Sequence, residues 1–401
     1  MQETNTGPAT ILQFRQDIEA QLRHQIREAL DVALKEELAA ALVSERHERT
    51  DHRRGYRNGV VERTITTATG TRIVTVPRGR LSGPDGTTRE FHSELVPRYA
   101  RRTREIDEAI LGCYLAGANS RRIRIALKPL LGEQHLSKSA VSRIVARLKA
   151  LFATWRDRDL ATERYPILFL DGFHLKIRLA RRVVSVPVLA VLGVAENGQK
   201  CLVDLRVAVS EAETTWGTVI TSLQERALAA PLLLVVDGQA ALKKALARWD
   251  GVRVQRCAVH KHENLNAHCP RHARAELKRD YHRIVNARDG LTAREAYDAF
   301  VKKWSTLCPA VARSLEEAGL ELLTFYDFPK RMWKSLRSTN TLENLNREFR
   351  RRTKTQASFS TEDAGVILLY GLVAFGQIQL RKIDGHKELP AFIAREWKQV
   401  A

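Results

Sequence analysis

The sequence predicts a multidomain α/β protein, in which helices flank a mixed β-sheet and further helical regions lie before and after it. Three observations support this class. The chain has 401 residues, enough for two or three domains with buried cores. Apolar residues recur at helical spacing in several stretches, whereas residues 166–257 contain β-branched and aliphatic runs. Hydrophobic residues make up 44% of the chain, which excludes a disordered protein.

The first predicted element is an amphipathic helix over residues 13–47, within a helical region of residues 1–50. Apolar residues from Leu12 to Leu42 recur every three or four positions, and charged residues occupy the other face. Such a helix needs an apolar partner surface, which is either a second copy of the chain or its own domain.

Residues 51–100 are predicted to form a basic loop and a small β-hairpin that bind DNA. The stretch 51–80 is rich in Arg and Gly and has two β-type runs around TATGT. The candidate DNA contacts here are Arg53, Arg54, Arg57 and Arg78.

Residues 101–152 are predicted to be helical and resemble a helix-turn-helix, whose second helix enters the major groove. In LSKSAVSRIVARLK (136–149), a serine-capped start precedes an apolar face that includes Val141 and Leu148. A helical hairpin without a DNA role explains the pattern equally well. The candidate DNA contacts are Arg121, Arg122, Lys138, Ser139, Ser142 and Arg143.

A sheet is predicted from residue 166 onwards. Three strands come first, and ENG at 196–198 is a strong hairpin signal between two of them. A helix (213–228), a strand ending at Asp237, a helix near 239–248 and a last strand follow. Three strands in a meander, followed by helical crossovers to parallel strands, give a mixed sheet with helices on its faces.

The rest of the chain is predicted to be helical. Residues 259–335 have no convincing strand, and 340–395 are also helical. The uncharged run 364–380 is at the short limit for a membrane span and is better explained as a buried helix. Trp216, Trp304 and Trp333 are interpreted as core residues, although either of the last two could stack on DNA.

The charge of the chain favours a polyanionic partner. Lys and Arg total 66 against 46 Asp and Glu, a formal charge of +20, and phosphates bound by such residues release counterions. A basic surface that only confers solubility is the alternative. Five Cys form an odd, sparse set without a disulfide framework, and the N-terminus lacks a secretory segment. We therefore expect a soluble, cytoplasmic, nucleoid-associated protein.

Two carboxylates each follow an apolar strand and precede a glycine. Asp171 closes ILFL before Gly172, and Asp237 closes LLLVV before Gly238. Either Asp-Gly pair alone is explained by a turn. Two of them on adjacent strands favour a site, because a glycine lets the backbone approach a ligand. Carboxylates suit Mg²⁺, and two such ions about 4 Å apart can clamp an in-line phosphoryl displacement. A third carboxylate is then needed.

Glu343 is the candidate for that third carboxylate. A structural explanation competes with this role, because Asn340 is a good N-cap with Glu343 three residues later, and Glu343 and Arg347 form an i, i+4 pair. Leu342, Leu345 and Phe349 form an apolar stripe on this helix, and Glu343 begins a separate, charged stripe. Cations follow Glu343 and are candidate DNA contacts: Arg347, Arg350, Arg351 and Lys354.

The stretch 257–272 is dense in Cys and His, which suggests zinc, but its spacing matches no standard zinc finger. A structural explanation of Cys257 and His260 within it is a buried Cys with a hydrogen-bonded His.

Several stretches, in order along nearly the whole chain, resemble the motifs of Mutator-type bacterial insertion-sequence transposases. These are RRGYRNG (53–59), TVPRGR (75–80), LSKSAVSRI (136–144), LDG (170–172), VVDG (235–238), QRCAVH (255–260) and RSTNTLENLNREFRRRTK (337–354). Two departures are visible: Ala241 stands where the family usually has Gly, and the usual Pro before the Q-x-C segment is absent.

The resemblance implies a ribonuclease H-like core whose catalytic and metal-binding triad is Asp171, Asp237 and Glu343, with Cys257 and His260 as a signature near the site. It implies two Mg²⁺ or Mn²⁺ ions, terminal inverted repeats and target DNA as partners, and a homodimer or larger oligomer. A core in two parts (160–258 and 336–401) would be interrupted by an all-helical insertion (259–335). A nuclease of the same fold and a non-catalytic DNA-binding regulator are the alternatives.

Overall fold

The computed structural model describes residues 8–67, 70–83, 86–98, 100–118, 120–131, 138–179, 182–208, 213–238, 242, 245, 249, 251–353 and 362–400. Within helices and strands, the side chains of a few further residues are also outside the description. The chain forms two compact units. The N-terminal unit holds Met1–Tyr114 and Ala118–Val145, and the C-terminal unit holds Leu115–Gly117 and Ala146–Ala401.

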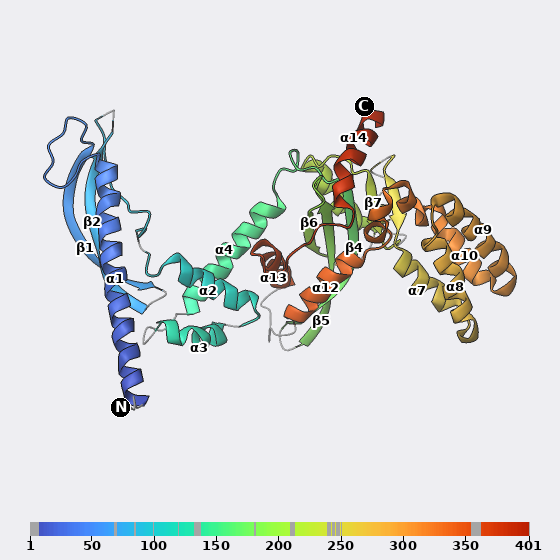
Figure 1. The fold of residues 1–401 in the computed structure, drawn as a ribbon, viewed down its shortest axis with the longest axis horizontal. Coiled ribbons are helices and arrows are strands. Elements are labelled where there is room, and N and C mark those ends of the chain that lie inside the picture. Colours follow the sequence, from blue (N-terminus) through green and yellow to red (C-terminus); the bar gives the residue numbers. More distant parts are fainter. Residues whose placement is uncertain are drawn as a thin grey trace, which may run out of the picture. The chain divides into compact units, whose positions relative to one another are not determined.

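The N-terminal unit begins with the predicted long helix, α1 (Pro8–Leu42), beside a three-stranded antiparallel sheet (Figure 1). Its strands are β1 (Gly55–Thr67), β2 (Gly70–Ser82) and β3 (Thr88–Glu90). Leu34 of α1 packs with Ile65 and Val74 of the hairpin, so the described end of the helix uses its own domain as the apolar partner. The helix ends five residues earlier than predicted, where Val43 adopts a φ of 52°.

The hairpin is confirmed but is longer than the sequence predicts. Residues 55–59 of the expected basic loop belong to β1, and Tyr56 pairs with Arg80 of β2. Gly55 has a φ of 132°, and a Cβ there would collide with the carbonyl of Arg80. The loop interpretation was therefore wrong for these residues: a glycine lets the strand begin where another residue would clash.

Three helices complete this part of the chain: α2 (Arg104–Leu115), α3 (Ser120–Leu131) and α4 (Lys138–Arg156). Ile110, Ile123, Val141 and Ile144 form their common core, as the helical spacing predicts. Ser139, Ser142 and Arg143 lie exposed on α4, on the face away from this core. The predicted serine cap falls at 136–137, outside the described residues.

The C-terminal unit contains a five-stranded mixed sheet in the order β6-β5-β4-β7-β8 (Figure 1). Its strands are β4 (Ile167–Leu179), β5 (Arg182–Val194), β6 (Lys200–Val207), β7 (Leu233–Val236) and β8 (Arg253–Arg256). β4, β5 and β6 pair antiparallel, whereas β4–β7 and β7–β8 pair parallel. The predicted succession of strands along the chain and the mixed sheet are confirmed, including the turn at 196–198, where Gly198 has a φ of 81°. Most of the helix predicted near 239–248 lies outside the described residues.

The two faces of β4 have different neighbours because successive side chains on a strand point to opposite sides. Leu168 and Leu170 join the core that includes Trp216 of α5 (Glu213–Glu225), so the interpretation of this tryptophan as a core residue is confirmed. On the other face, the ring of Phe173 lies 5.9 Å from that of Phe349 on α12 (Asn340–Thr353). Asp171 shares the Phe173 face by the same alternation.

The predicted helical stretch follows β8 and contains no strand anywhere between residues 259 and 335, all of which are described. Its main helices are α7 (Ala258–His268), α8 (Arg274–Val285), α9 (Gly290–Leu307) and α10 (Pro309–Ala318), with the short α11 (Trp333–Leu336) before α12 (Figure 1). Trp304 is buried and donates to Asp280 Oδ2 at 3.2 Å, so it is a core residue. The half-buried Trp333 packs on Tyr326.

Two helices follow α12: α13 (Glu362–Ala374) and α14 (Leu389–Val400). Val366, Leu368 and Leu372 of α13 are buried, as predicted for a core helix. Among the described helices, none is both long enough and apolar enough to span a membrane.

Candidate active site

The register of β4 and β7 brings Asp171 and Asp237 to neighbouring positions. Leu170 is the partner of Val236 in the parallel pairing, and each aspartate is the next residue along its strand. Asp171 is only 4% exposed, and Asp237 is half-buried. Because the residues before them are paired on adjacent parallel strands, the two aspartates lie side by side where the pairing of β4 and β7 ends.

The expectation that Asp171 ends its strand was wrong. β4 continues to Leu179, and Asp171 pairs with Ala190 of β5 within the antiparallel ladder. Only the parallel partner ends here, because β7 stops at Val236. Asp171 is therefore held by a continuous strand, whereas Asp237 begins a loop.

His260 on α7 connects all three predicted carboxylates. Its Nε2 lies 3.6 Å from Glu343 Oε1. Its hydrogen bond to Cys257 raises the pKa of His260 to about 9; burial opposes this shift, while the charges of Asp171 and Asp237 add to it. Glu343 Oε1 is buried and has no hydrogen-bond partner among the described residues. His260 thus contacts Glu343 directly and is influenced by the charges of Asp171 and Asp237.

Thr339 positions this imidazole, and the sequence did not single it out. Its hydroxyl lies 3.4 Å from His260 Nδ1 and 3.5 Å from Cys257 Sγ, and its backbone N–H donates to the same sulfur. Burial acts to raise the pKa of the Cys257 thiol, but hydrogen bonds with His260 and Thr339 outweigh it and lower the pKa. Cys257 itself precedes α7, and its N–H donates to Val236 O, next to Asp237.

The start of α12 differs from the predicted capping box. The helix already includes Asn340, and the N–H groups of Leu342 and Glu343 donate to Thr339 O. Thr339, and not Asn340, therefore occupies the capping position. Both residue types are good caps, so local propensity could not choose between them. Glu343 faces His260, and Arg347 donates to Asn344 Oδ1 instead of forming the predicted pair with Glu343.

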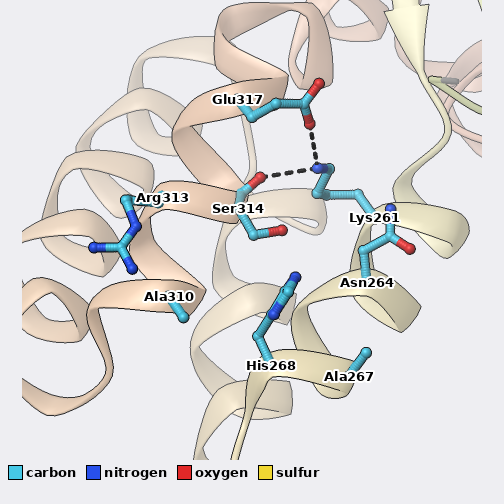
Figure 2. A pocket seen from close by; sticks show the side chains of 8 residues that line it. All are labelled: Lys261, Asn264, Ala267, His268, Ala310, Arg313, Ser314 and Glu317. Carbon is cyan, nitrogen blue, oxygen red and sulfur yellow. Dashed lines mark hydrogen bonds and ion pairs between the residues drawn. The ribbon is translucent and has the colours of Figure 1, made fainter. Parts of the chain in front are cut away.

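A cluster of ion pairs, in which the two cations are buried, lies behind Asp237. Gly238 has a φ of 92°, and a Cβ there would collide with the guanidinium of Arg256, which is 2% exposed. Arg256 donates to both carboxylate oxygens of Glu317 on α10. Glu317 also accepts from Lys261 Nζ at 2.7 Å, a contact that Figure 2 shows in a groove between α7 and α10. The helical stretch is thereby tied to the strand end beside Asp237.

The carboxylate set suits a hard divalent cation, because all three side chains offer oxygen donors and Glu343 Oε1 has an unmet hydrogen-bonding capacity. As they stand, no three His, Cys, Asp or Glu side chains in the described parts of the chain are close enough to surround one ion. The same finding covers the stretch 257–272, so nothing there supports zinc.

The candidate DNA contacts lie in both units. Arg53, Arg54, Arg78, Arg121 and Arg122 are exposed, and Arg57 is half-buried, with Nη2 3.3 Å from Ser44 O. Arg78 is partly neutralised by Glu90 at 3.1 Å. Arg347, Arg350 and Arg351 are exposed on α12. Lys354 and the side chain of Lys138 lie outside the described residues.

The family model described as "Transposase, Mutator family" matches residues 2–382, so the class is a transposase and the chain belongs to the Mutator family. The transposase for insertion sequence element IS905 of Lactococcus lactis subsp. lactis is 31% identical over 367 residues, 91% of each chain. The transposase for insertion sequence element IS406 of Burkholderia multivorans is 34% identical over 352 residues, which are 87% of this chain and 88% of that transposase. That for IS256 in transposon Tn4001 of Staphylococcus aureus is 30% identical over 77% of each.

Proposed function

We propose that this chain cleaves and joins DNA strands with Asp171, Asp237 and Glu343 as its catalytic carboxylates. The observation that carries the proposal is that strand register brings Asp171 beside Asp237, and that His260, whose pKa both aspartates raise, lies 3.6 Å from Glu343. Up to 172 residues (171 to 343) separate the three carboxylates in the sequence. The strand order β6-β5-β4-β7-β8, with two antiparallel and two parallel strand pairs, supports a ribonuclease H-like core. Residues 259–335 would then be the helical insertion.

The three carboxylates would hold two Mg²⁺ or Mn²⁺ ions. When bound, such ions neutralise phosphate charge and favour deprotonation of the attacking hydroxyl. Asp171 supplies a donor fixed by a continuous strand, and Glu343 supplies one from α12.

In the reaction, water and then a DNA 3′-hydroxyl would attack a phosphodiester in line, without a covalent enzyme intermediate. The arginines that follow Glu343 on α12 would direct the phosphate backbone into the site. The basic hairpin and the helices α3 and α4 of the N-terminal unit would bind the terminal inverted repeats, with α4 as the recognition helix. Two ends must be brought together, so a homodimer or larger oligomer is expected.

The test is a joining assay with the full chain, a duplex from the inverted repeat beside the gene, a target plasmid and Mg²⁺ or Mn²⁺. We expect Asp171→Asn, Asp237→Asn and Glu343→Gln each to lower joining by more than about 100-fold while DNA binding is retained. Losing a group that supports a metal ligand typically costs about 10–100-fold, and losing the metal ligand itself should cost more. Glu348→Gln, on the same helix and paired with Arg351, is the matched control.

Joining that survives Glu343→Gln would remove this residue from the triad. Two other functions remain outcomes of the same assay. Cleavage without joining by the wild-type chain would indicate a nuclease, and DNA binding alone would indicate a regulator.

A further inference from the structure

A second polar pocket, of about 470 Å³, opens beside the start of α12. α7, α8, the segment 334–338 and the first turn of α12 line it, together with Lys200 at the start of β6. Asn340 and Asn344 belong to this lining, and they flank Glu343 on the same helix. Residues three apart on a helix have Cβ atoms about 5–6 Å apart, so the pocket begins next to the carboxylate site.

The charge of this α7–α12 pocket is strongly positive. Lys200, Lys334 and Arg337 line it, and Asp384 is its one acidic residue among the described lining. Asp384 is engaged by Ser335, whose hydroxyl lies 3.0 Å from Asp384 Oδ2. Arg337 is anchored from one side by Val285 O and Asn286 Oδ1. An anion that entered the pocket would therefore meet an excess of cations.

Lys200 is the most informative of these residues. It is half-buried, and its ammonium group makes no hydrogen bond or ion pair with any part of the chain that the structure describes. Burial lowers its pKa, and the charge of Asp384 only partly opposes this. Placing a lysine there is unfavourable for folding unless an anion pairs with it.

Two further features suit a nucleotide strand rather than a small inorganic ion. His262 stacks on Tyr281 with ring centroids 5.2 Å apart, which leaves an aromatic surface in the lining. The first turn of the 14-residue helix α12 faces the pocket through Asn340 and Thr341, and helix N-termini favour phosphate. Together with the half-buried cation, they form a site for a phosphate and its attached nucleoside.

We propose that the α7–α12 pocket binds a phosphodiester of the DNA strand that neighbours the scissile phosphate, with Lys200 as the principal charge partner. The inference rests on the proposed function, because it takes DNA as the substrate. In this proposal the pocket fixes the position of the DNA strand along the site. Because one phosphate is held in the pocket, it determines which phosphodiester reaches Asp171, Asp237 and Glu343.

The test asks whether removing the charge of Lys200 and removing the charge of one DNA phosphate affect binding independently. Full-length wild type and Lys200→Met bind fluorescein-labelled inverted-repeat duplexes that carry a single neutral methylphosphonate, moved one position at a time around the cleavage point. We expect Lys200→Met to weaken binding of the unmodified duplex roughly tenfold and to lower the slope of log Kd against log salt by about 0.7–0.9. At one position, the methylphosphonate should weaken wild-type binding as much as Lys200→Met does. The same methylphosphonate should not weaken binding by the Lys200→Met variant any further.

Lys302→Met, an exposed position on α9, is the charge-matched control and should shift binding less than twofold. Thermal unfolding of Lys200→Met should occur at or above the wild-type temperature, because the variant keeps the side-chain length and removes a half-buried charge. An unchanged salt slope, or defects that add at every methylphosphonate position, would overturn the proposal. The Kd measurement does not depend on catalysis, so it tests the pocket separately from the joining reaction. If the wild type does not join DNA, that result counts against the proposed function and not against the pocket.

Discussion

At the scale of single residues, the site depends on groups that support the carboxylates. Thr339 is fully buried and contacts both Cys257 and His260. Cys257 is also the residue that joins α7 to the strand end, through Val236 O. A hydroxyl in this place sets the orientation of the imidazole, and therefore the distance between His260 and Glu343.

We expect Thr339→Val to lower the free energy of unfolding by about 1–2 kcal/mol, because it removes the hydroxyl at constant shape. Joining should fall roughly tenfold through the misplaced His260. Chemical denaturation and the joining assay measure the two effects. Thr218→Val, which changes an exposed threonine on α5, is the control. Unchanged joining by Thr339→Val would show that the imidazole needs no such support.

At the scale of elements, the ion-pair cluster connects α10 to β8 and to the loop after Asp237. Arg256 and Lys261 are both 2% exposed, and Glu317 is their common carboxylate (Figure 2). Burial acts to raise the pKa of Glu317, but its bonds to Arg256 and Lys261 outweigh burial and lower the pKa to about 2. The helices after β8 are thus attached to the catalytic sheet by charge as well as by apolar packing.

We expect Glu317→Gln to destabilise the protein by roughly 1–3 kcal/mol at neutral pH. Breaking a fully buried pair costs about 3–5 kcal/mol, but the Glu317 side chain is 55% exposed, so solvent screening reduces the effect. Because the folded-state pKa lies below the ordinary value of 4.5, this stability is present above pH 4.5 and is lost as the pH falls towards 2.

Thermal unfolding between pH 2 and pH 7 tests this expectation. The difference between wild type and Glu317→Gln should be largest above pH 4.5 and should shrink towards pH 2. Glu316→Gln, the exposed neighbour on α10, should show no such trend. A difference that is constant with pH would mean that Glu317 acts through packing and not through charge.

At the scale of the whole molecule, the two compact units carry different candidate roles. Ten of the proposed DNA contacts, from Arg53 to Arg143, belong to the N-terminal unit, whereas the three carboxylates belong to the C-terminal unit. A formal charge of +20 over the chain makes any DNA binding strongly dependent on salt. Recognition and chemistry should therefore be separable by mutation.

We expect the double variant Arg121→Ala, Arg122→Ala on α3 to weaken binding of the inverted repeat by roughly 10- to 100-fold, since each lost contact costs about 1–3 kcal/mol at most. Asp171→Asn should leave that affinity unchanged. Titrations at several salt concentrations measure both. Arg104→Ala on α2, whose side chain pairs with Glu108, is the control. Equal affinity of the double variant and wild type would place recognition elsewhere in the chain.

Local pattern was enough to predict most elements and the candidate carboxylates. The periodicity of 13–47, the strand runs after residue 166 and the strand-free stretch 259–335 all appear in the structure, because burying one face requires a regular spacing of apolar residues. Asp171 shows where this reasoning failed. The residues after it continue a strand only because β5 pairs with them as far as Leu179, which pairs with Arg182.

The sequence alone determined the element order and the basic character, and it predicted the three candidate carboxylates. Only the tertiary structure decided what surrounds them. His260 meets Glu343 across 83 residues (260 to 343), Arg256 meets Glu317 across 61, and Lys200 joins a pocket formed mainly by helices that follow it. Such contacts depend on which chain segments pack together, and residue spacing along one element carries no information about partners on another.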